Sequence, residues 1–263
     1  MTEFTTSQDG TRIAYEKVGS GPALVLVDGA MCYRDFGPCR SLAEHLADQF
    51  TVYFYDRRGR GESGDTAPYA PEREYEDLAA VIGAAGGNAF VAGFSSGGGL
   101  ALRAAAYGVG MRALASYEAP FVGQVTVKGK PVDALATLKS KLAAGDRAGM
   151  ISFFMVDMVG GPRFLPIMMR LMPKIHRQLM AVAHTLPYDT ELMNGFVVPA
   201  SELAGIRVPT LVMVGGKAKP NMVAGVQGVA DAVPGAVHEL LPGQTHQVSN
   251  DAIAPHLRTF FAG

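Results

Sequence analysis

The chain has 263 residues, 48% of them hydrophobic, and a formal net charge of -1. This length suits a single α/β unit with an insertion, and the composition allows a sizeable core. Because the chain has no overall positive charge, it has no field that would attract nucleic acid or an anionic membrane, and we expect neither as a partner.

The N-terminus has neither the basic start nor the apolar core of a signal peptide, and no uncharged apolar run approaches membrane-spanning length. The two cysteines, Cys32 and Cys39, are too few for a disulfide framework and belong to no metal-ligand pattern. We therefore expect a soluble, cytoplasmic protein that holds no metal and acts on a small molecule. Assembly into a homodimer stays open.

The chain opens with a predicted hairpin around Asp9-Gly10 and then alternates between strands and helices. Residues 23–27 are apolar throughout, as in strands buried on both faces of a parallel sheet. The predicted elements after the hairpin are strand 23–27, helix 41–47, strand 51–55, helix 72–85, strand 89–92, helix 96–107 and strand 112–117. This alternation predicts a mostly parallel sheet flanked by helices on both faces.

The alternation stops at residues 121–199, which we call the cap. This segment contains eight of the 13 methionines, and prolines break its helical pattern into short pieces. The alternation resumes with strand 210–214, helix 221–232, strand 236–241 and helix 253–261. We therefore predict an α/β core domain, residues 1–120 and 200–263, interrupted by an inserted helical cap domain, residues 121–199.

A serine lies at the turn between a predicted strand and a predicted helix, in the sequence Gly93-Phe94-Ser95-Ser96-Gly97. Nearly side-chain-free neighbours let the strand and the helix approach closely at such a turn. The turn holds the hydroxyl clear of the backbone, beside the free N–H groups of the helix. Ser95 is therefore a candidate nucleophile, and the alternative is a glycine-rich turn with two solvated serines.

A serine hydroxyl needs a base to take its proton, and histidine has a suitable pKa near neutrality. The chain has six histidines, and five of them fall in predicted helices, a predicted strand or the cap. His246 instead follows the last predicted strand, in a loop that can return to the sheet edge beside Ser95. We predict that His246 is the base rather than a surface histidine.

These features resemble the α/β-hydrolases. The residues that carry the resemblance are Asp28-Gly29-Ala30, the loop Asp56 to Ser63, the Ser95 turn and the late His246. The resemblance implies an α/β-hydrolase fold and an oxyanion hole made by the backbone N–H of Ser96 and that of Gly29 or Ala30. Many members have His-Gly where this chain has Asp28-Gly29. Asp28 either accepts hydrogen bonds from loop amides or contacts polar groups of the substrate.

The loop after residue 55 also contains a motif typical of dinucleotide binding, because residues 59–64 read G-x-G-x-x-G after a strand. Prolines follow, so no helix begins where a dinucleotide would need one. We therefore expect no nucleotide cofactor, and no cofactor of any other kind. The arginines of this loop, Arg57, Arg58 and Arg60, are predicted to brace it by pairing with Asp56 and Glu62.

The acid of the predicted triad departs from the commonest pattern. Many α/β-hydrolases carry it after the strand at residues 210–214, and here that loop contains no acid. Glu118 ends the preceding strand, in the sequence Glu118-Ala119-Pro120. A smaller set, the fungal zearalenone lactonases, is similar in this sequence, in Asp-Gly at the oxyanion turn and in Ser-Ser-Gly at the nucleophile. Their cap contributes a tryptophan, which this chain lacks, so their substrate is not implied.

We predict a cofactor-independent serine hydrolase that cleaves an ester or lactone of a hydrophobic small molecule through an acyl-enzyme, with Glu118 orienting His246. Within the cap, Phe154, Met155 and Met158 are predicted to bind substrate under an adaptable apolar roof, or else only to pack the cap onto the core. C–C bond hydrolysis or a lyase reaction would use the same triad. A slow or non-hydrolytic ligand receptor is the alternative outside catalysis.

Overall fold

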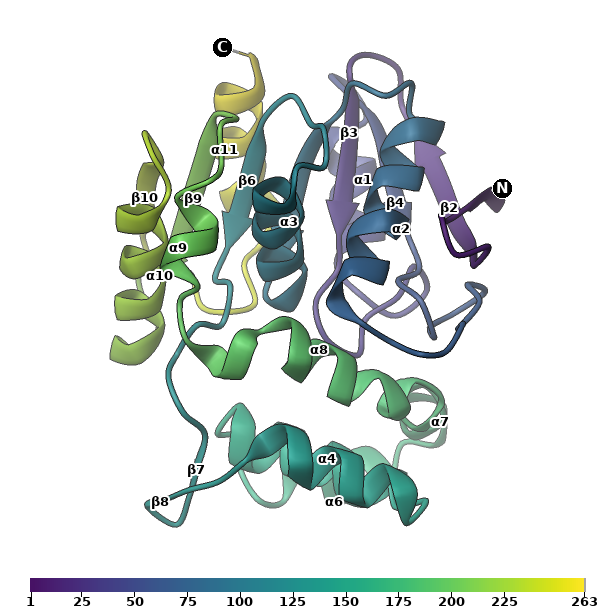
Figure 1. Ribbon diagram of the computed structural model, residues 1–263, viewed down its shortest axis with the longest axis vertical. Coiled ribbons are helices and arrows are strands. Elements are labelled where there is room, and N and C mark those ends of the chain that lie inside the picture. Colours follow the sequence, from purple (N-terminus) through teal and green to yellow (C-terminus); the bar gives the residue numbers. More distant parts are fainter. Residues whose placement is uncertain (263) are drawn as a thin grey trace.

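An eight-stranded sheet forms the centre of the computed structural model, which describes residues 1–262 (Figure 1). The strands lie in the order β1-β2-β4-β3-β5-β6-β9-β10, parallel from β4 onward and antiparallel at β1 and β2. Their bounds are β1 Glu3–Thr6, β2 Arg12–Val18, β3 Ala23–Val27, β4 Thr51–Tyr55, β5 Phe90–Phe94, β6 Leu114–Tyr117, β9 Thr210–Gly215 and β10 Val237–Leu241. The predicted fold class is confirmed.

Helices cover both faces of the sheet. The helices α1 (Cys39–Leu46) and α11 (Asn250–Ala262) lie behind it in Figure 1, and α2 (Pro71–Ala84) and α3 (Ser96–Tyr107) lie in front. Helix α10 (Pro220–Ala232) and the short α9 (Ala200–Leu203) pack on the same side as α3.

Successive side chains of the central strands point to opposite faces of the sheet. In β3, Leu24 and Leu26 belong to the core shared with α1 and α11, whereas Val25 and Val27 belong to the core shared with α2 and α3. A strand buried on both faces must be apolar at every position, which is the pattern that residues 23–27 show.

The cap covers the carboxyl ends of the parallel strands, at the bottom of Figure 1. It contains α4 (Ala134–Ala143), α5 (Arg147–Ser152), a π-helix (Phe153–Met158), α6 (Leu165–Arg170), α7 (Pro173–Val182), α8 (Leu186–Leu192) and 3₁₀ turns at Ala183–Thr185 and Asn194–Phe196. Helix α8 lies between the sheet edge and the other cap helices (Figure 1).

The predicted helical insert is confirmed, and its start also contains a short hairpin that we did not predict. There β7 (Thr126–Val127) and β8 (Lys130–Pro131) pair as an antiparallel hairpin. Lys128 and Gly129 both have positive φ, 51° and 76°, as a tight hairpin turn requires. Strands of two residues are too short to show any periodicity, so no pattern in the sequence predicts them. Across residues 1–262 every helix is too short or too polar to cross a bilayer.

Candidate active site

Ser95 occupies the sharp turn between β5 and α3, with φ 54° and ψ -127°. Positive φ is costly for a residue with a side chain, so the surroundings must hold this conformation. The backbone N–H of Ser95 donates to the carbonyl of Tyr117 at 2.9 Å, which ties the turn to β6. A Cβ on Gly97 would lie 2.3 Å from the carbonyl oxygen of Val27, so only glycine lets α3 begin this close to β3.

Glu118 directly follows β6, with a φ of 46°, and its side chain is 1% exposed. Its Oε1 accepts a hydrogen bond from the N–H of Gly215 at 2.9 Å. Its Oε2 lies 2.7 Å from Nδ1 of His246, whose side chain is 44% exposed. Both carboxylate oxygens are therefore engaged, and the imidazole donates from Nδ1, which leaves Nε2 free of the carboxylate.

The loop that carries His246 is fixed to the same edge of the sheet. The hydroxyl of Tyr117 donates to the carbonyl of Thr245 at 2.5 Å, and the N–H of Lys217 donates to the carbonyl of Gln244 at 2.8 Å. Tyr117 thus contacts both the Ser95 turn and the His246 loop. Within residues 1–262 no hydrogen bond joins Ser95 to His246, and the catalytic roles of these residues remain predictions.

The backbone predicted to form the oxyanion hole surrounds Ser95. Ser96 is the first residue of α3, so its N–H has no acceptor within the helix. Gly29 lies directly against the serine, because a Cβ built on it would be 3.0 Å from Cβ and 3.6 Å from Oγ of Ser95. Ala30 follows in the same loop. The structure therefore brings Gly29, Ala30 and Ser96 to one place.

Asp28 precedes this loop and is 2% exposed. Its carboxylate lies against Gly37, Cys32 and Cys39, and its Oδ1 has no hydrogen-bond partner. Burial raises the pKa of Asp28 to about 7, although the Cys39 thiol and nearby arginines oppose this. In the described part of the chain no loop N–H donates to this carboxylate, so the interpretation of Asp28 as an acceptor for loop amides is not supported. Its contact with substrate remains a prediction.

The arginines after β4 are buried and paired, but not with the partners that we predicted. Arg57 pairs with Glu74 and Asp189, Arg58 pairs with Asp9 and Asp77, and Arg60 pairs with Asp189. The predicted partners, Asp56 and Glu62, instead bind Arg34. Arg34 already binds Asp56 and Glu62, so the buried guanidinium groups of the loop take their counter-charges from acids of other elements.

The G-x-G-x-x-G segment forms a closed loop rather than the start of a helix. The N–H of Gly59 donates to the carbonyl of Gly64 at 2.9 Å, and α2 begins only at Pro71. Within residues 1–262 no three His, Cys, Asp or Glu side chains come together as a metal site.

The cap side chains predicted to bind substrate lie in the π-helix. Phe154, Met155 and Met158 are half-buried and pack against the main hydrophobic core. The neighbouring Phe164 and Met168 are exposed, by 62% and 45%. This packing suits either interpretation of the cap, so the substrate-binding role remains a prediction.

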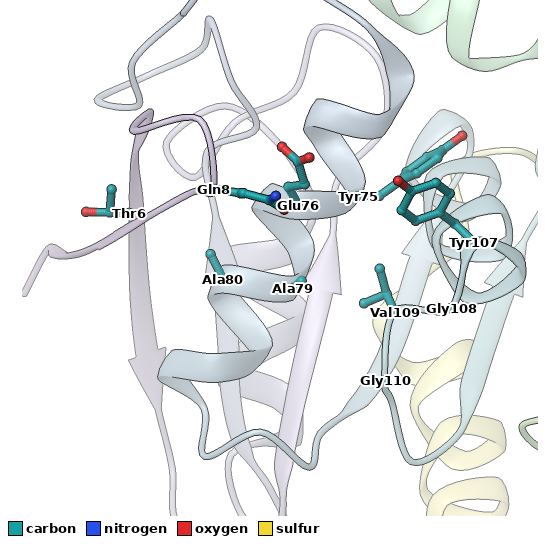
Figure 2. Close-up of a pocket in the computed structure, with 10 residues that line it drawn as sticks. All are labelled: Thr6, Gln8, Tyr75, Glu76, Ala79, Ala80, Tyr107, Gly108, Val109 and Gly110. Atoms are coloured by element: carbon teal, nitrogen blue, oxygen red, sulfur yellow. The ribbon is translucent and has the colours of Figure 1, made fainter.

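Two surface cavities lie away from Ser95. One, of about 480 Å³, runs from Thr6 and Gln8 to the adjacent rings of Tyr75 and Tyr107 (Figure 2), whose centroids are 5.3 Å apart. The other, of about 440 Å³, lies between the residues that flank the β7–β8 hairpin, the start of α4, the end of α8 and the 3₁₀ turn at Asn194–Phe196. Neither is lined by Ser95, Glu118 or His246, so neither belongs to the candidate active site.

Comparison with known proteins identifies the family. Residues 24–257 match the model of the alpha/beta hydrolase family. The chain belongs to this family. An alpha/beta hydrolase from Sphaerobacter thermophilus DSM 20745 is similar to this hydrolase at 47% identity, over 98% of this chain and 100% of that one, with a TM-score of 0.87.

More distant structures share the fold of this hydrolase. An enol-lactonase from Burkholderia xenovorans LB400 is 19% identical, over 99% of this chain and 100% of that one, with a TM-score of 0.69. An esterase from Rhodococcus sp. ECU1013 is 20% identical, over 100% and 98% of the two chains, with a TM-score of 0.68.

Proposed function

We propose that this alpha/beta hydrolase is a cofactor-independent serine hydrolase that cleaves an ester or lactone of a hydrophobic small molecule. The observation that carries the proposal is the 2.7 Å contact between His246 Nδ1 and a buried, doubly bonded Glu118, at the sheet edge where Ser95 turns into α3. Enzymes of the same fold that are called an esterase and an enol-lactonase support this substrate class.

In the proposed reaction, Oγ of Ser95 attacks the carbonyl carbon while Nε2 of His246 takes the hydroxyl proton. The N–H of Ser96 and an N–H of the Gly29 loop stabilise the oxyanion. His246 then gives the proton to the leaving alcohol, and the acyl group stays on Ser95. Water then attacks the acyl-enzyme while His246 takes its proton. His246 returns that proton to Oγ of Ser95 as the acid is released. Glu118 accepts the Nδ1 hydrogen bond throughout and stabilises the imidazolium.

We further propose that this chain belongs with the hydrolases that carry their acid after the sixth strand, as the zearalenone lactonases do. The loop after β9, where many relatives place this acid, reads Gly216-Lys217-Ala218-Lys219-Pro220. The side chain of Glu118 reaches the position that such an acid would occupy, because it binds both Gly215 and His246.

Turnover and labelling test the proposal together. Purified protein should hydrolyse p-nitrophenyl esters and simple lactones, and a serine-directed phosphonate should abolish turnover and add its mass to the peptide that contains Ser95. His246→Ala should be inactive, whereas the matched control His256→Ala should keep its activity, although His256 also bonds a glutamate, Glu239. Ligand-induced thermal stabilisation without turnover would instead indicate a receptor. Cleavage of diketones but not esters would indicate C–C hydrolysis.

A further inference from the structure

A carboxylate of the cap reaches the residue after the candidate nucleophile. Asp189 lies on α8 and is only 4% exposed. Its Oδ1 accepts hydrogen bonds from Oγ of Ser96 at 2.7 Å and from Nη1 of Arg57 at 2.8 Å. Its Oδ2 accepts from Nη2 of Arg60 at 2.7 Å. One cap side chain therefore holds the first residue of α3 and two arginines of the core.

The same carboxylate is linked to the other side of the predicted oxyanion hole. Arg60, which it holds, donates from Nη1 to the carbonyl oxygen of Gly29 at 2.7 Å. The peptide bond between Gly29 and Ala30 is planar and trans, so its C=O and its N–H point in opposite directions. Fixing the carbonyl of Gly29 therefore fixes the N–H of Ala30. The Asp189–Arg60 link therefore bears on Ala30, one of the two predicted second donors.

The charged groups around Asp189 favour its ionised form and so its hydrogen bonds to Ser96, Arg57 and Arg60. Burial by itself would raise the pKa of Asp189, but Arg60, Arg57 and the Ser96 hydroxyl more than offset burial and hold the pKa below its ordinary value. Arg57 is also bonded through Nε and Nη2 to Glu74, at 2.6 and 2.8 Å. Two arginines thus face two buried carboxylates, and removing Asp189 would leave Arg60 without its paired carboxylate, whereas Arg57 would keep Glu74.

We propose that Asp189 is a positioning residue that ties the cap to the oxyanion hole, holding Ser96 through its hydroxyl and Ala30 through Arg60 and the Gly29 carbonyl. The proposal rests on the proposed serine hydrolase activity. Its consequence is that both N–H donors are correctly aimed only when α8 is seated on the core. Because such donors act mainly on the transition state, their misalignment lowers kcat more than it raises KM.

The test compares Asp189→Asn with Asp77→Asn. Asp77 is a matched control, since it is 1% exposed and binds Arg58 of the same loop through both oxygens at 2.7 Å, yet contacts neither Ser96 nor Gly29. Asp189→Asn should lower kcat for a p-nitrophenyl ester by about ten- to a hundredfold with KM within about threefold. It should weaken binding of an alkyl trifluoromethyl ketone, which forms an oxyanion on Ser95, by a similar factor. Asp77→Asn should change neither kcat nor the affinity for the ketone by more than about threefold, even if its melting temperature falls.

The proposal would be overturned if both variants lost kcat and ketone affinity equally. It would also be overturned if kcat and ketone affinity of Asp189→Asn stayed within about threefold of wild type. If Asp189→Asn does not fold, Ser96→Ala decides, because it removes the hydroxyl link and keeps the backbone N–H. It should lower kcat several-fold with unchanged KM, and an unchanged kcat would refute the link. A wild-type protein that neither turns over esters nor reacts with a phosphonate would refute the proposed function itself, which is a separate result.

Discussion

Replacing Glu118 by glutamine tests the candidate triad most directly, because the structure predicts how the new amide will lie. The N–H of Gly215 points at Oε1 of Glu118 from 2.9 Å. In Glu118→Gln the amide oxygen must take this place, since an NH₂ group there would leave a buried donor without an acceptor, at a cost of about 1–3 kcal/mol. The NH₂ group therefore faces Nδ1 of His246.

An NH₂ group can only donate, so Nδ1 must become the acceptor and the ring proton moves to Nε2. Nε2 is the atom that should take the proton of Ser95, so the base is lost while the geometry is kept. A tautomer error of this kind lowers the rate by about four powers of ten, or about 5.4 kcal/mol of transition-state stabilisation. We expect this loss in kcat/KM for a p-nitrophenyl ester.

The matched control is Glu239→Gln, which changes the other glutamate that bonds a histidine through Nδ1, at a partly exposed site. It should leave kcat/KM unchanged. Thermal unfolding of both variants should stay close to that of wild type. The reasoning is refuted if folded Glu118→Gln keeps more than about a tenth of the wild-type rate, or if Glu239→Gln loses as much.

Three further predictions follow from the same site. Ser95→Ala and His246→Ala should each lower ester hydrolysis by about three or more powers of ten without lowering the melting temperature, and a wild-type rate in either would contradict its assigned role. If Phe154 and Met155 belong to an adaptable roof, esters of bulky hydrophobic acids should be cleaved faster than acetates, and a strict preference for small charged esters would count against it. Because burial raises the pKa of Asp28 to about 7, its ionisation opposes folding, so stability should fall as pH rises from about 4 to 7. Asp28→Asn should remove this penalty, which reaches up to about 4 kcal/mol at pH 8. The check is the free energy of unfolding by urea at pH 5 and at pH 8. A change in this free energy between the two pH values that is the same in Asp28→Asn and in wild type would contradict the prediction.

The sheet could be predicted from the sequence because its strands are buried on both faces. Residues 23–27 and 51–55 are strands in the structure with the predicted bounds, and helix 96–107 also has them. The Ser95 turn and Glu118 were recognisable because each lies at the end of an apolar run, where strand ends meet at one edge. These signals are local, and each can be read within a few consecutive residues.

The Asp189 cluster could not be predicted in this way. Asp189 lies 93 residues from Ser96 and 132 from Arg57, and no periodic pattern relates these positions. Nearness along the chain favoured Asp56 as the partner of the arginines, but Asp56 binds Arg34. One signal was available: three arginines in a short loop next to a buried strand need acids from elsewhere, and Asp189 is the first acid after Asp157.

The attachment of α8 also bears on how enzymes of this shape can exchange parts. Phe164 and Leu171, near the tip of the cap, are exposed by 62% and 78%, whereas Asp189 is enclosed by core side chains. Recombination that replaces residues 121–183 would vary the part of the cap that we predict to cover the substrate and leave the α8 contact intact. A crossover that also replaces α8 would have to bring its own carboxylate for Arg57 and Arg60. We expect α8 to be inherited with the core, and the tip of the cap to diverge first when specificity changes.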